Sequence, residues 1–185
     1  MKRPRKAVIP CAGYGTRFLP ITKIIPKELL PIGNKPAIHY VVEEAVKAGL
    51  EEVILVCNRS KISVADYFKP NPELMEFLEG KNKSETIEEL KKLESMAEIR
   101  VVYQDEPKGL GDAVLCSRTA VGGEPFLVIL PDDLIVHKVS GSEQLLTACG
   151  ERNSWGILLE RVPKERVSSY GIIRGERIAE NIFTI

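Results

Sequence analysis

The sequence predicts an α/β fold, a doubly wound and mostly parallel sheet with helices on both faces. Short apolar runs recur at residues 7–9, 53–56, 99–103, 126–130 and 156–159, and each is too short for a core helix. These runs are continuously apolar, which is typical of parallel strands that are buried on both faces. Segments with helical spacing lie between them, so strands and helices alternate along the chain. In such sheets, ligands bind beyond the carboxyl ends of the strands, where the strand order reverses.

The first predicted helix covers residues 37–48. Its apolar side chains at positions 38, 41, 42, 45 and 46 fall on one face. Gly49 follows as a C-terminal stop, because glycine readily adopts the left-handed conformation that ends a helix. A later helix is predicted to open near Gly109 and to run to about Arg118.

Residues 59–97 are predicted to form a charged helical excursion between two strands. Apolar residues with helical spacing occur within 74–78 and again within 87–93, which indicates two amphipathic helices. A charge-rich run of this kind is usually a solvated face.

Length and composition favour a single domain over residues 1–185. A chain of 185 residues buries roughly 70% of its unfolded surface, enough for one sizeable core. The 26 basic and 26 acidic side chains balance, which argues against a general nucleic-acid or membrane binder. The basic opening at residues 1–6 precedes only a few apolar residues, so neither a signal peptide nor a membrane span is expected.

The cysteine pattern predicts a reducing, cytoplasmic location. The four cysteines are widely scattered without a CxxC pair, and the two histidines are isolated. Buried thiols in a reducing compartment fit this spacing, and no zinc site is expected.

The run from residue 6 to residue 32 predicts a phosphate-binding loop. An apolar strand leads into small residues, which include Ala12, Gly13, Gly15 and Thr16. Small residues let backbone N–H groups approach phosphate oxygens closely. Two cations, Arg17 and Lys27, follow in the same run. Arginine offers a bidentate fork to phosphate, and lysine offers a mobile point charge.

Two better-known phosphate loops do not fit this run. The dinucleotide fingerprint requires a third glycine where this chain has Phe18, and the P-loop requires Gly-Lys-Ser/Thr, which does not occur in this run. Prolines at positions 20, 26 and 31 forbid a continuous helix, so the cations lie on an irregular loop. If only the glycines and Arg17 are considered, an ordinary glycine-rich turn with surface cations is the alternative to a phosphate-binding loop.

The stretch GYGTRFLPITKIIPKELLPI resembles the signature of the sugar nucleotidyltransferases, and within that family the branch that uses UTP. The resemblance implies a Rossmann-like nucleotidyltransferase fold. It also implies a Mg²⁺-dependent reaction in which glucose 1-phosphate attacks the α-phosphorus of UTP, giving UDP-glucose and pyrophosphate without a covalent enzyme intermediate. In that reaction Arg17 neutralises the β- and γ-phosphates and Lys27 the α-phosphate, so both are candidate catalytic residues.

Gln104 follows the third apolar run, and Gly109 stands at the entry of the next helix. A glutamine side chain offers both a donor and an acceptor, as the edge of a uracil does. The alternative is a polar strand end followed by a turn. Gln-x4-Gly resembles the base-reading motif of the family, which implies that Gln104 and Gly109 select the pyrimidine. Asp112 departs from the histidine that is common in the branch; it suits a helix dipole but is unfavourable near a triphosphate.

Asp132 and Asp133 follow the fourth apolar run. Mg²⁺ typically takes one or two carboxylates and fills its shell with phosphate oxygens and water. The alternative is a turn with solvated acids. The resemblance implies that Asp132 is the metal ligand, with Asp133 in a supporting role.

Tyr170 and Gly171 stand before another predicted strand. The pair is similar to a sugar-binding turn of the family, which implies that the Gly171 amide contacts a hexose hydroxyl. A plain strand start fits the two residues equally well.

Members of the resembled family are longer than 185 residues, so the C-terminal part of the domain is expected to be missing from this chain. That part carries a Glu-Lys-Pro motif of the sugar site, a later lysine for the sugar phosphate and a second metal-binding aspartate. The implied substrates are UTP and glucose 1-phosphate, and the complete enzyme is expected to be a homo-oligomer. Two alternatives stay open: a sugar-1-phosphate nucleotidyltransferase for dTTP, CTP or GTP, and a non-catalytic nucleotide-binding module.

Overall fold

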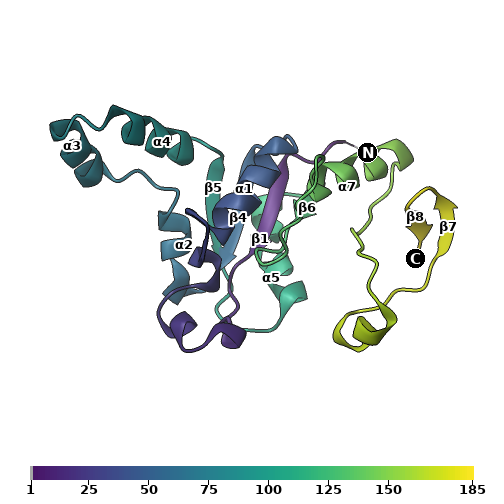
Figure 1. Ribbon diagram of the computed structural model, residues 1–185. Helices are drawn as coiled ribbons and strands as arrows, with labels where there is room; N and C mark the ends of the chain where they lie inside the picture. Colours follow the sequence, from purple (N-terminus) through teal and green to yellow (C-terminus); the bar gives the residue numbers. More distant parts are fainter. Residues whose placement is uncertain (1) are drawn as a thin grey trace.

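The computed structural model describes residues 2–185 and builds them around a sheet of parallel strands (Figure 1). The strands are β1 (Lys6–Pro10), β4 (Glu52–Cys57), β5 (Glu98–Tyr103) and β6 (Phe126–Val128), and their order across the sheet is β5-β4-β1-β6. The chain moves outward from β1 through β4 to β5 and returns with β6 to the other side of β1. The strand order therefore reverses between β1 and β6, which is where ligands of doubly wound sheets bind.

Helices cover both faces of the sheet, as predicted. One face carries α1 (Ala37–Lys47) and α7 (Gly141–Arg152), and the other carries α5 (Leu110–Cys116) and α6 (Arg118–Val121). Because successive residues of a strand point to opposite faces, β1 sends Ala7 and Ile9 toward α1 and Val8 toward α5. Burial on both faces is the physical reason for the continuous apolar runs.

The helix predicted at residues 37–48 is α1. Ile38, Val41 and Val42 are fully buried on its apolar face. Gly49 ends the helix with a φ of 84° and donates its N–H to Val46 O at 2.9 Å, so the predicted stop is correct.

Residues 59–97 contain η4 (Arg59–Lys61), α2 (Ser63–Asp66), α3 (Pro72–Gly80) and α4 (Ser84–Glu94). Figure 1 shows α3 and α4 extending away from the sheet. The side chain of Asn71 caps α3 by accepting a hydrogen bond from Leu74 N at 3.1 Å, and Pro72 occupies the first turn. No side chain of α3 is fully buried, and only Met75 and Leu78 are partly shielded from solvent, so most of this helix is solvated.

The prediction of a strand at residues 156–159 is wrong. No secondary structure is assigned there, and Ile157, Leu158 and Leu159 are 51%, 42% and 49% exposed. A strand requires a neighbour for its backbone hydrogen bonds, and apolar side chains alone do not provide one. The strand expected after Gly171 is β7 (Glu176–Ala179), which begins at Glu176 and pairs antiparallel with β8 (Ile182–Thr184).

One strand and one helix end earlier in the structure than predicted. The strand predicted to reach residue 130 ends at Val128. The helix predicted to reach Arg118 ends at Cys116 and is followed directly by α6. After α7, the only further helical segment among residues 2–185 is η5 (Lys164–Ser169).

The loop after β1 consists of short turns, as its prolines predict. Its 3-10 helices are η1 (Thr16–Phe18), η2 (Ile21–Lys23) and η3 (Lys27–Leu29), and a small hairpin of β2 (Pro31–Ile32) and β3 (Lys35–Pro36) follows.

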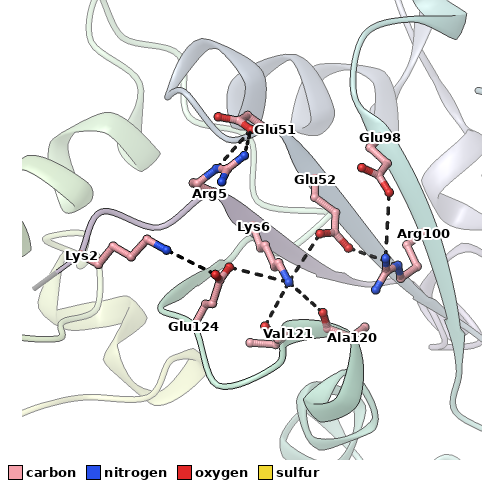
Figure 2. A network of polar contacts seen from close by, with 10 residues as sticks. All are labelled: Lys2, Arg5, Lys6, Glu51, Glu52, Glu98, Arg100, Ala120, Val121 and Glu124. Carbon is pink, nitrogen blue, oxygen red and sulfur yellow. Dashed lines mark hydrogen bonds and ion pairs between the residues drawn. The ribbon is translucent and has the colours of Figure 1, made fainter.

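Charged side chains tie the strands together at the amino-terminal edge of the sheet (Figure 2). Lys6 Nζ donates to Ala120 O at 3.0 Å and to Val121 O at 3.1 Å, at the end of α6. The same ammonium lies 3.6 Å from the carboxylate of Glu52, which also pairs with Arg100 at 3.2 Å. A cation at free helix carbonyls suits the helix dipole, so this network fixes α6 against the sheet at the edge opposite the carboxyl ends of the strands.

Within residues 2–185, no helix has the length and apolarity needed to cross a membrane.

Candidate active site

The predicted cations and the predicted metal ligand meet at the carboxyl edge of the sheet. Lys27 Nζ lies 2.7 Å from Asp132 Oδ2, and a guanidinium nitrogen of Arg17 lies 3.4 Å from the same oxygen. Asp132 follows β6, and both cations belong to the loop that follows β1. The structure therefore places the three side chains where the strand order reverses.

The two cations differ in how firmly they are held. The Lys27 side chain is 16% exposed, whereas that of Arg17 is 82% exposed. Lys27 follows Pro26 at the start of η3, and its side chain is largely shielded from solvent, so its position is set by the protein. Arg17 extends into solvent, where it can follow a ligand.

Asp132 carries a full negative charge at neutral pH. Its partial burial raises the pKa, but the hydrogen bond from Lys27 and the charges of Lys27 and Arg17 outweigh that effect and hold the pKa of Asp132 below its ordinary value. The ionised carboxylate can attract a divalent cation, and the two side chains that now neutralise it can turn to phosphates.

The small residues of the loop leave their backbone donors free. Among residues 2–185, no acceptor is recorded for the backbone N–H groups of residues 12–16. A Cβ added at Gly13 would meet nothing within 4 Å, so a ligand can approach the backbone there. At Gly15, φ is 65°, and an added Cβ would lie 3.2 Å from both Lys27 Cβ and Thr22 Cγ2. Consecutive free amides in such a turn form an anion-binding nest.

Two backbone carbonyls of the loop accept hydrogen bonds from side chains that were not predicted from the sequence. Asn58 Nδ2 donates to Ala12 O at 2.8 Å, and Lys61 Nζ donates to Gly13 O. Both side chains follow β4 and reach the carboxyl edge of the sheet. Since the carbonyls are engaged on the protein side, the amides are left for a ligand. For Asn58, the position just after a predicted strand was the available signal.

A buried ion pair lies beneath the loop. Lys61 Nζ is 3.0 Å from Glu28 Oε2, and the two side chains are 7% and 0% exposed. Glu28 Oε1 has no hydrogen-bond partner among residues 2–185. The pair joins η3 to η4 and so fixes the loop from below.

Cys11 is fully buried at the end of β1. A hydrogen bond with the Cys57 thiol, together with burial, raises the pKa of Cys11 well above its ordinary value. Cys11 is therefore a neutral thiol with a packing role.

Gln104 and Gly109 lie together at the end of β5. Gln104 is 6% exposed, and its Nε2 donates to Gly109 O at 3.1 Å. Gly109 has a φ of 94°, a conformation that other residues rarely adopt. The same Nε2 donates to Asp112 Oδ2 at 2.7 Å, so the carboxylate of Asp112 is engaged with an amide.

The two remaining predicted site residues, Thr16 and Gly171, lie in different parts of the structure. Thr16 is exposed at the start of η1, beside the free amides. Gly171 is exposed between η5 and β7, and an added Cβ would meet nothing within 4 Å. Figure 1 shows that its segment lies apart from the sheet, so the structure does not bring Gly171 to the other candidate residues.

The site elements follow one another along the sheet edge. Gln104 comes after β5, the loop of free amides after β1 and Asp132 after β6. Neighbouring strands lie about 4.8 Å apart, so the row from Gln104 to Asp132 spans roughly 14 Å. A buried side-chain amide, a loop of free backbone amides with two cations, and an ionised carboxylate thus follow one another along this edge.

Comparison with known proteins identifies the family to which the chain belongs. A family model described as "Nucleotidyl transferase" matches residues 6–182. The UTP–glucose-1-phosphate uridylyltransferase of Bacillus subtilis (strain 168) is 49% identical over 173 residues, which cover 94% of this chain and 59% of that protein. The UTP–glucose-1-phosphate uridylyltransferase 2 of Streptococcus pyogenes serotype M3 is 45% identical over 177 residues, with 94% and 59% covered.

Solved structures show the same similarity. The UTP-bound UGPase from Acinetobacter baumannii superposes with a TM-score of 0.90 at 39% identity, covering 96% of this chain and 63% of that one. A UDP-glucose pyrophosphorylase complexed with UDP-glucose gives a TM-score of 0.82 at 40% identity, covering 97% and 66%. The chain thus spans about three fifths of the length of the curated relatives it matches. Since the family model matches nearly all of its residues, the chain belongs to the nucleotidyl transferase family.

Proposed function

We propose that this chain is the nucleotide-binding part of an enzyme that transfers uridylyl from UTP to glucose 1-phosphate, giving UDP-glucose and pyrophosphate. The observation that carries the proposal is the row of groups along the sheet edge, from Gln104 through the free amides to Lys27 and Asp132. A nucleoside triphosphate has the same order of base, sugar and phosphates. The names of the relatives and the two liganded structures support UTP and the glucose product.

Catalysis in this proposal rests on positioning and neutralisation of charge. Lys27 holds the α-phosphate, since its side chain is largely shielded from solvent and its ammonium is fixed at the site. Arg17 is exposed and reaches the β- and γ-phosphates, which leave as pyrophosphate. Such preorganised charges stabilise the transition state, and the loss of one commonly costs about 10²- to 10³-fold in rate.

The carboxylate of Asp132 fits Mg²⁺ as the cofactor. Among residues 2–185, no three His, Cys, Asp or Glu side chains gather as a metal-binding group. One ionised carboxylate beside a phosphate site suits Mg²⁺, which takes most of its ligands from phosphates and water. Asp132 would hold the ion, which would supply positive charge to neutralise the phosphates.

Some assignments concern the longer enzyme. Gly171 is proposed to contact the hexose in that longer enzyme, although its segment lies apart from the sheet in this structure. Homo-oligomeric assembly is also proposed only for that enzyme. The four free cysteines support a reducing, cytoplasmic location.

Calorimetry tests the proposal on the chain itself. Mg²⁺-UTP should bind, and Arg17→Ala and Asp132→Ala should each weaken binding strongly, because phosphate and metal contacts are lost. Lys23→Ala is the matched control, since it removes a cation of the same loop that makes no ion pair recorded among residues 2–185. Failure of Mg²⁺-UTP to bind would contradict the proposal.

A second assay separates an enzyme from a binding module. Pyrophosphate release after addition of glucose 1-phosphate to the chain with Mg²⁺-UTP would establish turnover. Binding of Mg²⁺-UTP without pyrophosphate release would favour a non-catalytic nucleotide-binding module for this chain. Parallel assays with ATP, CTP, GTP and dTTP identify the base.

A further inference from the structure

The side-chain amide of Gln104 is held by two acceptors. Its Nε2 atom lies 3.1 Å from Gly109 O and 2.7 Å from Asp112 Oδ2. A primary amide carries two N–H hydrogens, so these two bonds use its whole donor capacity. Gln104 is only 6% exposed, which keeps water from competing for these bonds.

The two acceptors also determine how the amide is oriented. A rotation by half a turn would place Oε1 against Gly109 O and against the Asp112 carboxylate, oxygen facing oxygen. That arrangement would lose two hydrogen bonds, one of them strengthened by the charge of Asp112. The Oε1 atom therefore points away from both acceptors and is the polar atom of Gln104 left for a ligand.

We propose that Asp112 is a positioning residue that makes Gln104 a pure hydrogen-bond acceptor and so selects nucleobases with an N–H at ring position 3. The inference rests on the proposed function, in which the base of a nucleoside triphosphate lies at the end of β5. Uracil and thymine carry a donor at N3, which Oε1 can accept. Cytosine has a lone pair at N3, which would face the lone pairs of Oε1.

The contribution of Asp112 is separate from that of Gly109. The carbonyl of Gly109 belongs to the backbone, also accepts the Ala113 N–H, and engages only one of the two hydrogens of the Gln104 amide. Without the Asp112 carboxylate, the second hydrogen is free, and the amide can rotate to offer a donor to cytosine. The first turn of α5 places Asp112 on this contact, and the Cys116 thiol lies 4.0 Å from the same Oδ2 atom.

Nucleotide selectivity measured by calorimetry tests this role. The chain is titrated with UTP, dTTP and CTP in the presence of Mg²⁺, and Asp112→Ala is compared with the unmodified chain. We expect the unmodified chain to bind UTP more tightly than CTP, and Asp112→Ala to reduce this preference by about tenfold, the value of one buried hydrogen bond. The ratio of UTP to dTTP affinity should stay unchanged, because both bases carry the N3–H group.

Two further variants provide controls. Asp112→Asn keeps an acceptor oxygen for Gln104 Nε2 and should retain most of the preference for UTP over CTP. Glu106→Ala removes a nearby exposed acid that pairs with Lys108 at 2.7 Å, and it should leave every affinity ratio unchanged. It therefore measures the general effect of removing negative charge near a triphosphate.

The outcomes separate the inference from the proposed function. An equal change in the affinities for all three nucleotides in Asp112→Ala would assign a merely structural role to Asp112 and overturn the inference alone. Loss of UTP preference in Asp112→Asn as large as in Asp112→Ala would do the same. Failure of the unmodified chain to bind any of the nucleotides would overturn the proposed function, and the inference with it.

Discussion

Replacement of Lys61 by methionine should destabilise the protein strongly, because it leaves the carboxylate of Glu28 buried without a counter-ion. The two side chains are 7% and 0% exposed, and their charged atoms lie 3.0 Å apart. The other carboxylate oxygen, Oε1, already lacks a partner among residues 2–185. Breaking a buried pair costs about 3–5 kcal/mol, since the remaining charge can be neither paired nor hydrated. The carbonyl of Gly13 loses its donor in the same step.

The free energy of unfolding, measured by urea denaturation with far-UV circular dichroism, provides the assay. The double variant Glu28→Gln/Lys61→Met removes the orphaned charge and should recover much of the loss. Lys69→Met is the matched control, because the Lys69–Asp66 pair has a similar distance of 2.9 Å but side chains 57% and 50% exposed. Exposed pairs contribute little, so the control should change stability only slightly.

Equal effects of Lys61→Met and Lys69→Met would refute the reasoning, because burial would then make no difference to the value of the pair. A double variant less stable than Lys61→Met would refute it as well. Binding of Mg²⁺-UTP should also weaken in Lys61→Met, since the loop loses the donor that holds Gly13 O.

Three further predictions follow from other parts of the structure. Gly15→Ala should destabilise the protein by about 1 kcal/mol and weaken UTP binding, measured by urea denaturation and calorimetry, since φ is 65° and Lys27 Cβ lies 3.2 Å away. Lys6→Met should cost about 1–3 kcal/mol in the urea assay without changing UTP affinity, because two helix carbonyls lose their donor at the opposite edge of the sheet. Burial lowers the pKa of His39 below 6.5, and this effect outweighs the hydrogen bond with Glu43, which raises the pKa. As the pH falls, His39 therefore takes up a proton more readily in the unfolded chain than in the folded chain. The urea midpoint should therefore fall as pH decreases below 6.5, and His39→Gln should reduce this slope.

The fold class is predictable because burial on two faces leaves a local pattern. Each of the four strands of the sheet coincides with an apolar run, and α1 coincides with a stripe of helical spacing. The error at residues 156–159 shows the limit of the pattern, since apolar side chains do not reveal whether a neighbouring strand is present. In the structure these residues lack backbone pairing and remain partly exposed.

The candidate site was predictable where chemistry depends on residue type at a fixed spacing. Small residues followed by Arg17 and Lys27 indicate a phosphate loop, and Asp132 directly follows a buried strand. The supporting residues were missed because their role depends on partners distant in sequence. Lys61 contacts Glu28, 33 positions away, and nothing in the local sequence marks either side chain as buried.

The sequence by itself determined the alternation of strands and helices, and it predicted the candidate residues for phosphate, base and metal at the strand ends. These features follow from hydrophobic period and side-chain chemistry, which are local properties of the chain. Only the tertiary structure decided the strand order, the meeting of Lys27 with Asp132 and the orientation of the Gln104 amide by Asp112. Hydrogen bonds and ion pairs depend on distances and directions in space, and separation along the chain does not encode them.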